Sequence, residues 1–159
     1  MNTVFESADI RFVRVSRLLV RDYLAMVNDI ENVGRRIGIT EPVTEEEELR
    51  WVNEKLEAKA PVFSMLEKKS GAFIGTIELM DVRDSVGELG IAIAAEKQGL
   101  GYGTQAIPAI VEYGMNLLGL NRIFLKVYPD NLRAIHVYEK CGFREYDRTA
   151  DGVFMETTR

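Results

Sequence analysis

Three glycines within five residues mark the boundary between a predicted strand and a predicted helix. The segment reads Gln98-Gly99-Leu100-Gly101-Tyr102-Gly103-Thr104, after the apolar run at 89–94 and before a helix expected to reach Leu118. Glycine lets a backbone bend and approach a bound group closely, and the first N–H groups of a helix have no intrahelical partner. Together with the helix dipole, these N–H groups favour an anion. The segment therefore predicts a phosphate or pyrophosphate site where a strand passes into a helix.

The chain ahead of this loop carries the pattern of antiparallel strands. Apolar and basic residues alternate over Ile10–Val15, as in a half-buried strand. Turns at Lys68–Gly71 and Asp84–Gly87 join three further strands into a meander. We expect these strands at 62–66, 72–77 and 89–94, with helices at 18–28 and 44–58. The second helix opens with a capping box, Thr44 and Glu47, inside a run of glutamates that suits the positive end of a helix dipole.

The order of elements changes after the loop. We expect the long helix to be followed by a strand at 122–128, a helix at 131–140, and two short strands near Phe143 and Val153–Met155. A strand, a helix and a second strand in succession indicate a parallel pair. The predicted fold class is a mixed α/β sheet, in which an antiparallel meander is followed by a βαβ unit, within a single domain spanning residues 1–159. Because the sequence stops at Arg159, we expect the last strand to be short.

The residues of the loop narrow the choice of phosphate ligand. A Walker A loop places Lys and then Ser or Thr after its last glycine, whereas Thr104-Gln105 follows Gly103, so a nucleoside triphosphatase is not favoured. The dinucleotide fingerprint G-x-G-x-x-A fits residues 101–106, and Asp130 lies where an acid that binds ribose belongs. Against this, residues 95–99 separate the strand from the loop, and only one βαβ unit is predicted. A dinucleotide-binding oxidoreductase is therefore the second interpretation.

The helix at 131–140 favours a different ligand. Asn131 is a good N-cap for this helix, and Gly142 is a good residue to end it. Asn131, Ala134 and Tyr138 stand at i, i+3 and i+7, so they share one helix face. A long ligand lying along that face would meet an amide, a small residue and a phenol in turn.

Taken together, two motifs resemble those of the GNAT superfamily of N-acetyltransferases. The first is Gln98-x-x-Gly101-x-Gly103, and the second runs from Asn131 to Phe143. Within the superfamily, the chain resembles the branch of ribosomal-protein N-terminal acetyltransferases and spermidine N-acetyltransferases. The resemblance covers nearly the whole chain and implies the acyl-CoA N-acyltransferase fold, with acetyl-CoA as co-substrate. It implies direct transfer of the acetyl group to a primary amine, of a protein N-terminus, a polyamine, an amino sugar or an aminoglycoside, and it makes a homodimer a reasonable expectation.

The resemblance also implies roles for individual positions. The pyrophosphate would be held by the backbone amides of Gln98, Gly99, Leu100, Gly101, Tyr102, Gly103 and Thr104. The pantetheine arm would pair with the main chain of Ile91, Ala92 and Ile93. One N–H of that stretch would polarise the thioester carbonyl. Asn131 would bond to the arm beside Ala134, and Tyr138 would stand near the sulfur.

Direct transfer also needs an acid and a base. Tyrosine, with a reference pKa of about 10, can donate a proton to a departing thiolate, and Tyr138 is the predicted donor. The attacking amine is mostly protonated at neutral pH and must lose a proton first. Glu78 and Glu88 are the candidate bases, acting directly or through water.

The composition argues against several other classes of protein. A formal net charge of −5 disfavours a general nucleic-acid binder. Cys141 is the only cysteine, which excludes a multi-cysteine zinc site, and we expect no metal. No apolar run approaches the ~20 residues of a membrane span, and Met1–Glu6 lacks the features of a signal peptide, so we expect a cytoplasmic protein. A non-catalytic acyl-CoA sensor on the same fold is a third interpretation.

Overall fold

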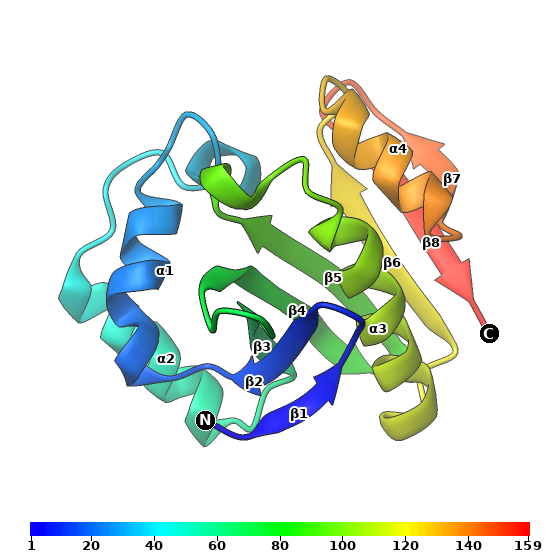
Figure 1. The fold of residues 1–159 in the computed structure, drawn as a ribbon. Coiled ribbons are helices and arrows are strands. Elements are labelled where there is room, and N and C mark those ends of the chain that lie inside the picture. Colours follow the sequence, from blue (N-terminus) through cyan, green and yellow to red (C-terminus); the bar gives the residue numbers. More distant parts are fainter.

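One eight-stranded sheet organises the chain in the computed structural model, which describes residues 1–159 (Figure 1). The strands lie in the order β1-β2-β3-β4-β5-β6-β8-β7. Their bounds are β1 Thr3–Glu6, β2 Ile10–Arg14, β3 Val62–Glu67, β4 Phe73–Arg83, β5 Val86–Ile93, β6 Arg122–Val127, β7 Arg144–Arg148 and β8 Val153–Thr158. The α-helices are α1 Val20–Val27, α2 Glu45–Glu57, α3 Tyr102–Leu117 and α4 Leu132–Lys140, and the 3₁₀ helices are η1 Arg17–Leu19, η2 Gly34–Ile37 and η3 Ala95–Lys97.

The sheet is antiparallel except at one pair of strands. Each strand from β1 to β5 runs antiparallel to its neighbour, and β8 runs antiparallel to both β6 and β7. Strands β5 and β6 are parallel, with α3 as the crossover between them. The predicted mixed α/β class, a meander followed by a βαβ unit, is confirmed.

The strands differ from the expectation in several places, of which three change the sheet most. Thr3–Glu6 forms a strand that the sequence does not predict, because its 4 residues are too few to show an alternating pattern. Strand β4 continues to Arg83 rather than ending near Ile77. Strand β8 has 6 residues and pairs with β6 from Arg122 to Val127, so the expectation of a short last strand is wrong. Pairing on both sides, with β6 and β7, supports its full length.

Strands β5 and β6 pair only where each begins. Val86–Glu88 lies opposite Arg122–Phe124, and no pairing follows beyond Glu88. The two strands then diverge, as Figure 1 shows in green and yellow. Beyond the divergence, β5 keeps β4 on one side and has no strand on the other.

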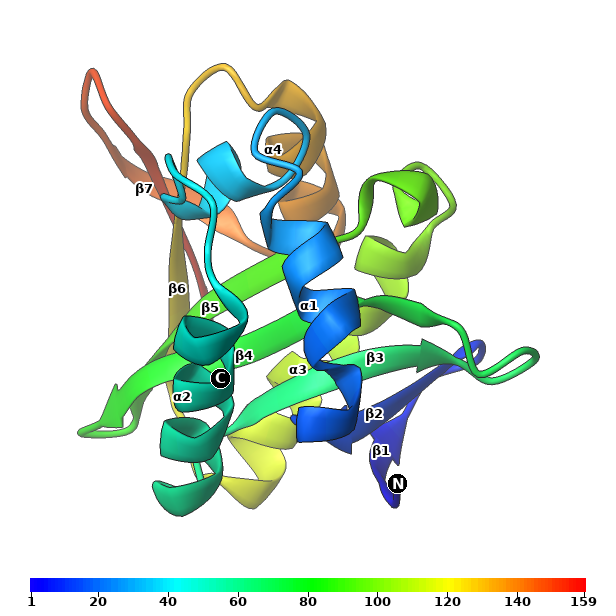
Figure 2. The same cartoon turned by 90° about the vertical axis from the view of Figure 1, so that its left-hand side faces the viewer.

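Helices cover both faces of the sheet. In Figure 2, α1 and α2 lie in front of the strands and α3 lies behind them. On the α1–α2 side, Tyr23 and Val52 are buried against Val13 of β2. On the other side, Ile107 of α3 belongs to the cluster that contains Ile77 of β4. Packing on both faces fixes the sheet on which the site is built.

A proline lies inside α3 without ending the helix. Pro108 has no N–H, so the carbonyl of Thr104 lacks its usual partner four residues later. The thiol of Cys141, at the end of α4, approaches this carbonyl with an Sγ–O distance of 3.9 Å. A thiol is a weak donor. The contact links the end of α4 to the first turn of α3.

A buried hydrogen-bond chain anchors α1 to the sheet and should contribute to stability. The Tyr23 hydroxyl lies 2.5 Å from the Ser64 hydroxyl and accepts the Ser16 N–H at 3.0 Å. Tyr23→Phe leaves both partners unsatisfied, and we expect the free energy of unfolding to fall by about 1–3 kcal/mol. Urea denaturation measures the change. Tyr128→Phe is the control, since this exposed hydroxyl makes no hydrogen bond within the chain, and equal losses in both variants would contradict the assignment.

Candidate functional site

A cleft of about 1340 Å³ opens where β5 and β6 separate. Its walls come from α1, α2 and the segment between them, from β4, β5 and β6, from the loop at 97–104 and from α4. Of the candidate residues, only Leu100 lies outside the cleft, with its side chain in solvent. The others all line it: Glu78, Glu88, Ile91, Ala92, Ile93, Gln98, Gly99, Gly101, Tyr102, Gly103, Thr104, Asn131, Ala134 and Tyr138.

The glycine loop presents free N–H groups at the start of α3. Gly99 and Gly101 have φ angles of 74° and 87°, in the left-handed region that glycine adopts without strain. No side chain caps α3, and no acidic residue lies in its first turn. The N–H groups of residues 99–104 donate to no acceptor in the chain. The prediction for the Gln98 amide is wrong, because its N–H already donates to the Ala95 carbonyl at 3.2 Å and closes the turn of η3. This end of the cleft therefore fits an anion that accepts several hydrogen bonds.

A carboxylate on β3 anchors the same loop. Glu67 accepts hydrogen bonds from the hydroxyls of Ser70, at 2.6 Å, and of Tyr102, and its Oε2 lies 3.1 Å from Lys97 Nζ. Hydrogen bonds from Ser70, Tyr102 and Lys97 lower the pKa of Glu67 to about 2. The bond to Glu67 raises the pKa of Tyr102 to about 12. The carboxylate thus stays ionised and joins the loop to the end of β3.

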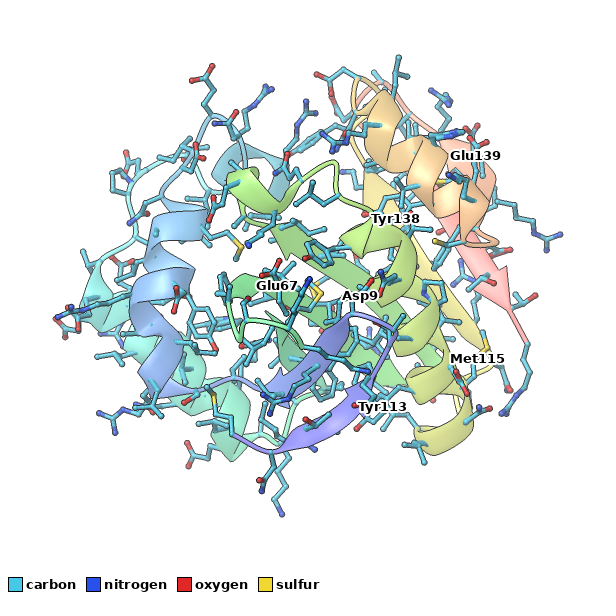
Figure 3. All side chains as sticks on the ribbon, in the orientation of Figure 1. Asp9, Glu67, Tyr113, Met115, Tyr138 and Glu139 are labelled. Atoms are coloured by element: carbon cyan, nitrogen blue, oxygen red, sulfur yellow. The ribbon has the colours of Figure 1, made fainter.

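A second anchor reaches α3 from the turn between β1 and β2. Gln105 Nε2 donates to Asp9 Oδ2 at 2.8 Å, and Gln105 Oε1 accepts from the Asp9 N–H at 3.0 Å. Figure 3 shows Asp9 and Glu67 near the start of α3. The sequence does not reveal either anchor, because the partners lie 96 and 35 residues apart along the chain.

The middle of the cleft exposes one edge of β5. Ala94 donates its N–H to Ile74 of β4, and successive residues of a strand direct their N–H groups to opposite sides. Ala92 therefore also faces β4, whereas Ile91 and Ile93 face the open side. The side chain of Gln98 donates to the Ile93 carbonyl at 2.9 Å. The N–H groups of Ile91 and Ile93 are left facing the cleft without a strand partner.

Helix α4 forms the opposite wall, and the predicted face of this helix is confirmed. Asn131, Ala134 and Tyr138 are all half-buried and line the cleft. Asn131 Oδ1 accepts the Ala134 N–H at 3.3 Å, which leaves the amide NH₂ of Asn131 to donate. Burial raises the pKa of Tyr138 to about 12, and its hydroxyl makes no hydrogen bond within the chain. In Figure 3, Tyr138 points toward the interior, and Glu139 points away from it.

The two candidate bases lie on one face of the sheet. Glu78 stands opposite Gly90, and Glu88 stands opposite Met80, so both pairs project to the same side. Gly90 has no side chain to cover Glu78. Glu88 is the last residue of β5 that pairs with β6, so it lies at the point where the strands separate.

Burial raises the pKa of both candidate bases. For Glu78, Lys55 opposes the shift, with Nζ 3.7 Å from Oε1, while Asp81 and Glu88 add to it. For Glu88, Asp81 adds to the shift and Lys126 opposes it. Glu78 thus has an ion-pair partner, whereas Glu88 has none.

Two further features of the cleft are not evident from the sequence. Arg36 of η2 pairs with Asp130, at 2.9 Å, and joins two walls of the cleft. Asp130, which the dinucleotide interpretation assigns to a ribose, therefore already has a partner. Glu48 is buried and lines the cleft, although its place in a run of helix-start glutamates favours an exposed position.

The cleft combines the open edge of β5 with an uncapped helix start that fits an anion. A model of the family described as "Acetyltransferase (GNAT) domain" matches residues 10–144. The chain belongs to the GNAT family of acetyltransferases.

Individual relatives agree with this assignment. The chain is 30% identical over 145 residues to the spermidine N(1)-acetyltransferase of Vibrio cholerae, covering 87% of this chain and 83% of the relative. A GNAT-family acetyltransferase structure from Bacillus anthracis superposes with a TM-score of 0.84 at 18% identity, over 96% of each chain. A spermidine N-acetyltransferase from Vibrio cholerae, in complex with CoA and spermine, gives a TM-score of 0.82 at 24% identity, over 95% of this chain and 96% of that one. The two structures show the shared fold.

The protein is thus an enzyme that transfers the acetyl group of acetyl-CoA to an amine. Neither the dinucleotide-binding nor the sensor interpretation finds support. The sheet itself argues against a dinucleotide fold, because β1 to β5 form an antiparallel run and only β5 and β6 are parallel. None of the helices combines the length and the apolar character that a membrane span requires.

The link between Tyr102 and Glu67 should affect acetyl-CoA binding. Tyr102→Phe removes the hydroxyl that joins the loop to β3, and we expect the Kd for CoA to rise on the order of threefold to tenfold. Titration calorimetry measures the change. Tyr113→Phe is the control, since Tyr113 lies in the same helix and stacks on Phe5, 4.9 Å between ring centroids. Unchanged CoA affinity in Tyr102→Phe would mean that the loop needs no such anchor.

Proposed function

We propose that acetyl-CoA and a small amine occupy the cleft together and that the acetyl group passes directly between them. The open edge of β5 carries this proposal, with the glycine loop at one end and two carboxylates near the other. Acetyl-CoA supplies the activated acyl group as a thioester. Every other requirement of the reaction has a candidate residue in this chain.

The residues present fit the phosphorylated carrier. The free N–H groups of residues 99–104 would bind the pyrophosphate, and the prediction includes the backbone of Leu100 although its side chain is exposed. The amide NH₂ of Asn131 would donate to the pantetheine arm above Ala134. These contacts would orient the ligand along the cleft, with its reactive end between β5 and α4.

An N–H group of β5 would stabilise the negative charge that develops on the carbonyl oxygen. Ile91 and Ile93 direct N–H groups into the cleft, whereas Ala92 directs its own toward β4. We therefore assign the predicted main-chain role of residues 91–93 to Ile91 and Ile93. A donor of this kind is worth about 3–4 kcal/mol in enzymes where it has been removed.

Tyr138 would donate the proton that the leaving thiolate takes up. Its hydroxyl faces the cleft without a partner in the chain, and burial holds its pKa near 12, so it stays protonated over the working range of pH. Glu88 or Glu78 would accept the proton of the attacking amine, directly or through water. Glu88 is the better placed of the two, because Glu78 is already paired with Lys55.

A small cationic amine is the acceptor that we propose. The carboxylates of Glu78 and Glu88 lie in the acceptor half of the cleft and would attract a positive charge. The relative from Vibrio cholerae is named for spermidine, which belongs to this class. A homodimer and a cytoplasmic location remain predictions from the sequence.

Removal of the Tyr138 hydroxyl should slow the chemistry and spare the binding of acetyl-CoA. For Tyr138→Phe we expect kcat to fall by about 10²- to 10⁴-fold. Release of the CoA thiol with spermidine measures turnover. Stabilisation of the variant by acetyl-CoA should persist, at about 2.7 kcal/mol when the ligand is at 100 times its Kd. An unchanged kcat would remove Tyr138 from the mechanism, and no turnover by the wild type with any small amine would overturn the proposed acceptor class.

The pH dependence should distinguish the two candidate bases. A base must be ionised, and burial raises the pKa of Glu88, so kcat/KM should rise with pH through this raised value. Tyr138 should cause no decline on the alkaline side below about pH 10, because its pKa is about 12. In Glu88→Gln the acidic limb should disappear and kcat/KM should fall. If Glu78→Gln alone removes that limb, Glu78 is the base instead.

A further inference from the structure

Glu48 occupies an unusual position for a carboxylate. It lies one turn into α2, and only 8% of its surface is exposed. Residues three, four and seven positions later, Trp51, Val52 and Lys55, share its helix face and point toward the sheet. Lys55 forms an ion pair with Glu78, so this face of α2 borders the proposed acceptor half of the cleft.

No group in the chain neutralises Glu48. Its carboxylate makes no hydrogen bond and no ion pair, whereas the neighbouring Glu47 completes the capping box with Thr44. Burial raises the pKa of Glu48, and no nearby cation opposes the shift. Every fully buried side-chain oxygen of the chain has a hydrogen-bond partner, so the unpaired oxygens of Glu48 must be open to the cleft. A carboxylate that is largely withdrawn from water gains from a cation beside it. The position therefore lacks a positively charged partner.

The surroundings of Glu48 suit an organic cation. Trp51 is partly exposed and lines the cleft beside it, and its ring is supported edge-on by the buried ring of Tyr23, with centroids 5.9 Å apart. The Tyr23 hydroxyl is already bonded to Ser64, so it offers Glu48 no proton. Aromatic rings next to a carboxylate attract alkylammonium groups, through the ring faces and the charge together.

We propose that Glu48 binds a second ammonium group of the acceptor, so that the enzyme selects amines with two or more cationic nitrogens. This inference rests on the proposed function, since it assigns a subsite for the far end of the same acceptor. Glu48 and Lys55 are seven positions apart in α2, or about 10 Å along the helix axis. The second nitrogen would therefore lie on the order of 10 Å from Glu78, which favours a long diamine or a triamine.

Glu48→Gln tests the subsite, because it removes the charge and keeps the shape. The acceptors are 1,7-diaminoheptane and heptylamine, which differ only in the second nitrogen. We expect the KM for the diamine to rise at least tenfold, with kcat little changed and the KM for heptylamine within twofold of the wild type. Glu45→Gln is the matched control, since this exposed glutamate lies on the same helix outside the cleft, and it should change neither KM.

Thermal unfolding gives a second, independent readout. The diamine should raise the melting temperature of the wild type and not that of Glu48→Gln, whereas acetyl-CoA should stabilise both. The free variant should be about as stable as the wild type, because the oxygens of Glu48 are open to the cleft and the substitution breaks no hydrogen bond or ion pair. Glu48→Asp, which keeps the charge and shortens its reach, should show an intermediate diamine KM and serves if the glutamine variant folds poorly.

The outcomes separate this inference from the proposed function. Equal changes in KM for the two amines, or no change for either, would overturn the role of Glu48 and leave the acetyl transfer to a small amine intact. If the wild type acetylates neither amine and neither stabilises it, the proposed acceptor class fails, and the subsite fails with it. Stabilisation by the diamine that depends on Glu48 would support the subsite even where turnover is slow.

Discussion

The separation of β5 from β6 is the constraint on which the rest of the site depends. Backbone N–H and C=O groups inside a protein need partners, and a sheet normally supplies them from strand to strand. Here the pairing of β5 with β6 ends at Glu88, so the backbone N–H groups of Ile91 and Ile93 have no partner on a neighbouring strand. The glycine loop, α4 with Tyr138, and the carboxylate of Glu88 are all placed relative to that gap. An extended ligand can complete the hydrogen bonding that the sheet leaves unfinished, as in strand addition.

Two buried or partly buried carboxylates show how differently one chain can treat the same group. Glu67 receives hydrogen bonds from two hydroxyls and the charge of Lys97, and its pKa falls to about 2. It acts within the protein, as an anchor for the loop. Glu48 accepts no side-chain hydrogen bond and has no ion-pair partner, and burial alone raises its pKa. The contrast separates a carboxylate whose partners lie within the chain from one that has no partner there.

Local signals in the sequence predict much of this structure. The capping box of Thr44 and Glu47 is present as expected, and Gly101 adopts the left-handed conformation at the start of α3 that its loop requires. The βαβ unit follows from the order of elements around that loop. Strand β1 is not predicted, because its 4 residues show no alternating pattern and only its pairing with β2 makes it a strand. The burial of Glu48 is not predicted either, because four consecutive glutamates look alike in sequence, and only the packing of α2 decides which one faces inward.

The two walls of the cleft come from different lengths of the chain. The helices on the proposed acceptor side, α1, η2 and α2, lie within residues 20–57, whereas the groups proposed to hold acetyl-CoA lie within residues 91–138. Between these two segments, only β4 and the beginning of β5 contribute residues to the cleft. This separation has an evolutionary consequence, since sites can change on a fold that is retained. Substitutions within residues 20–57 can change which amine is acetylated, while residues 91–138 keep the same use of acetyl-CoA.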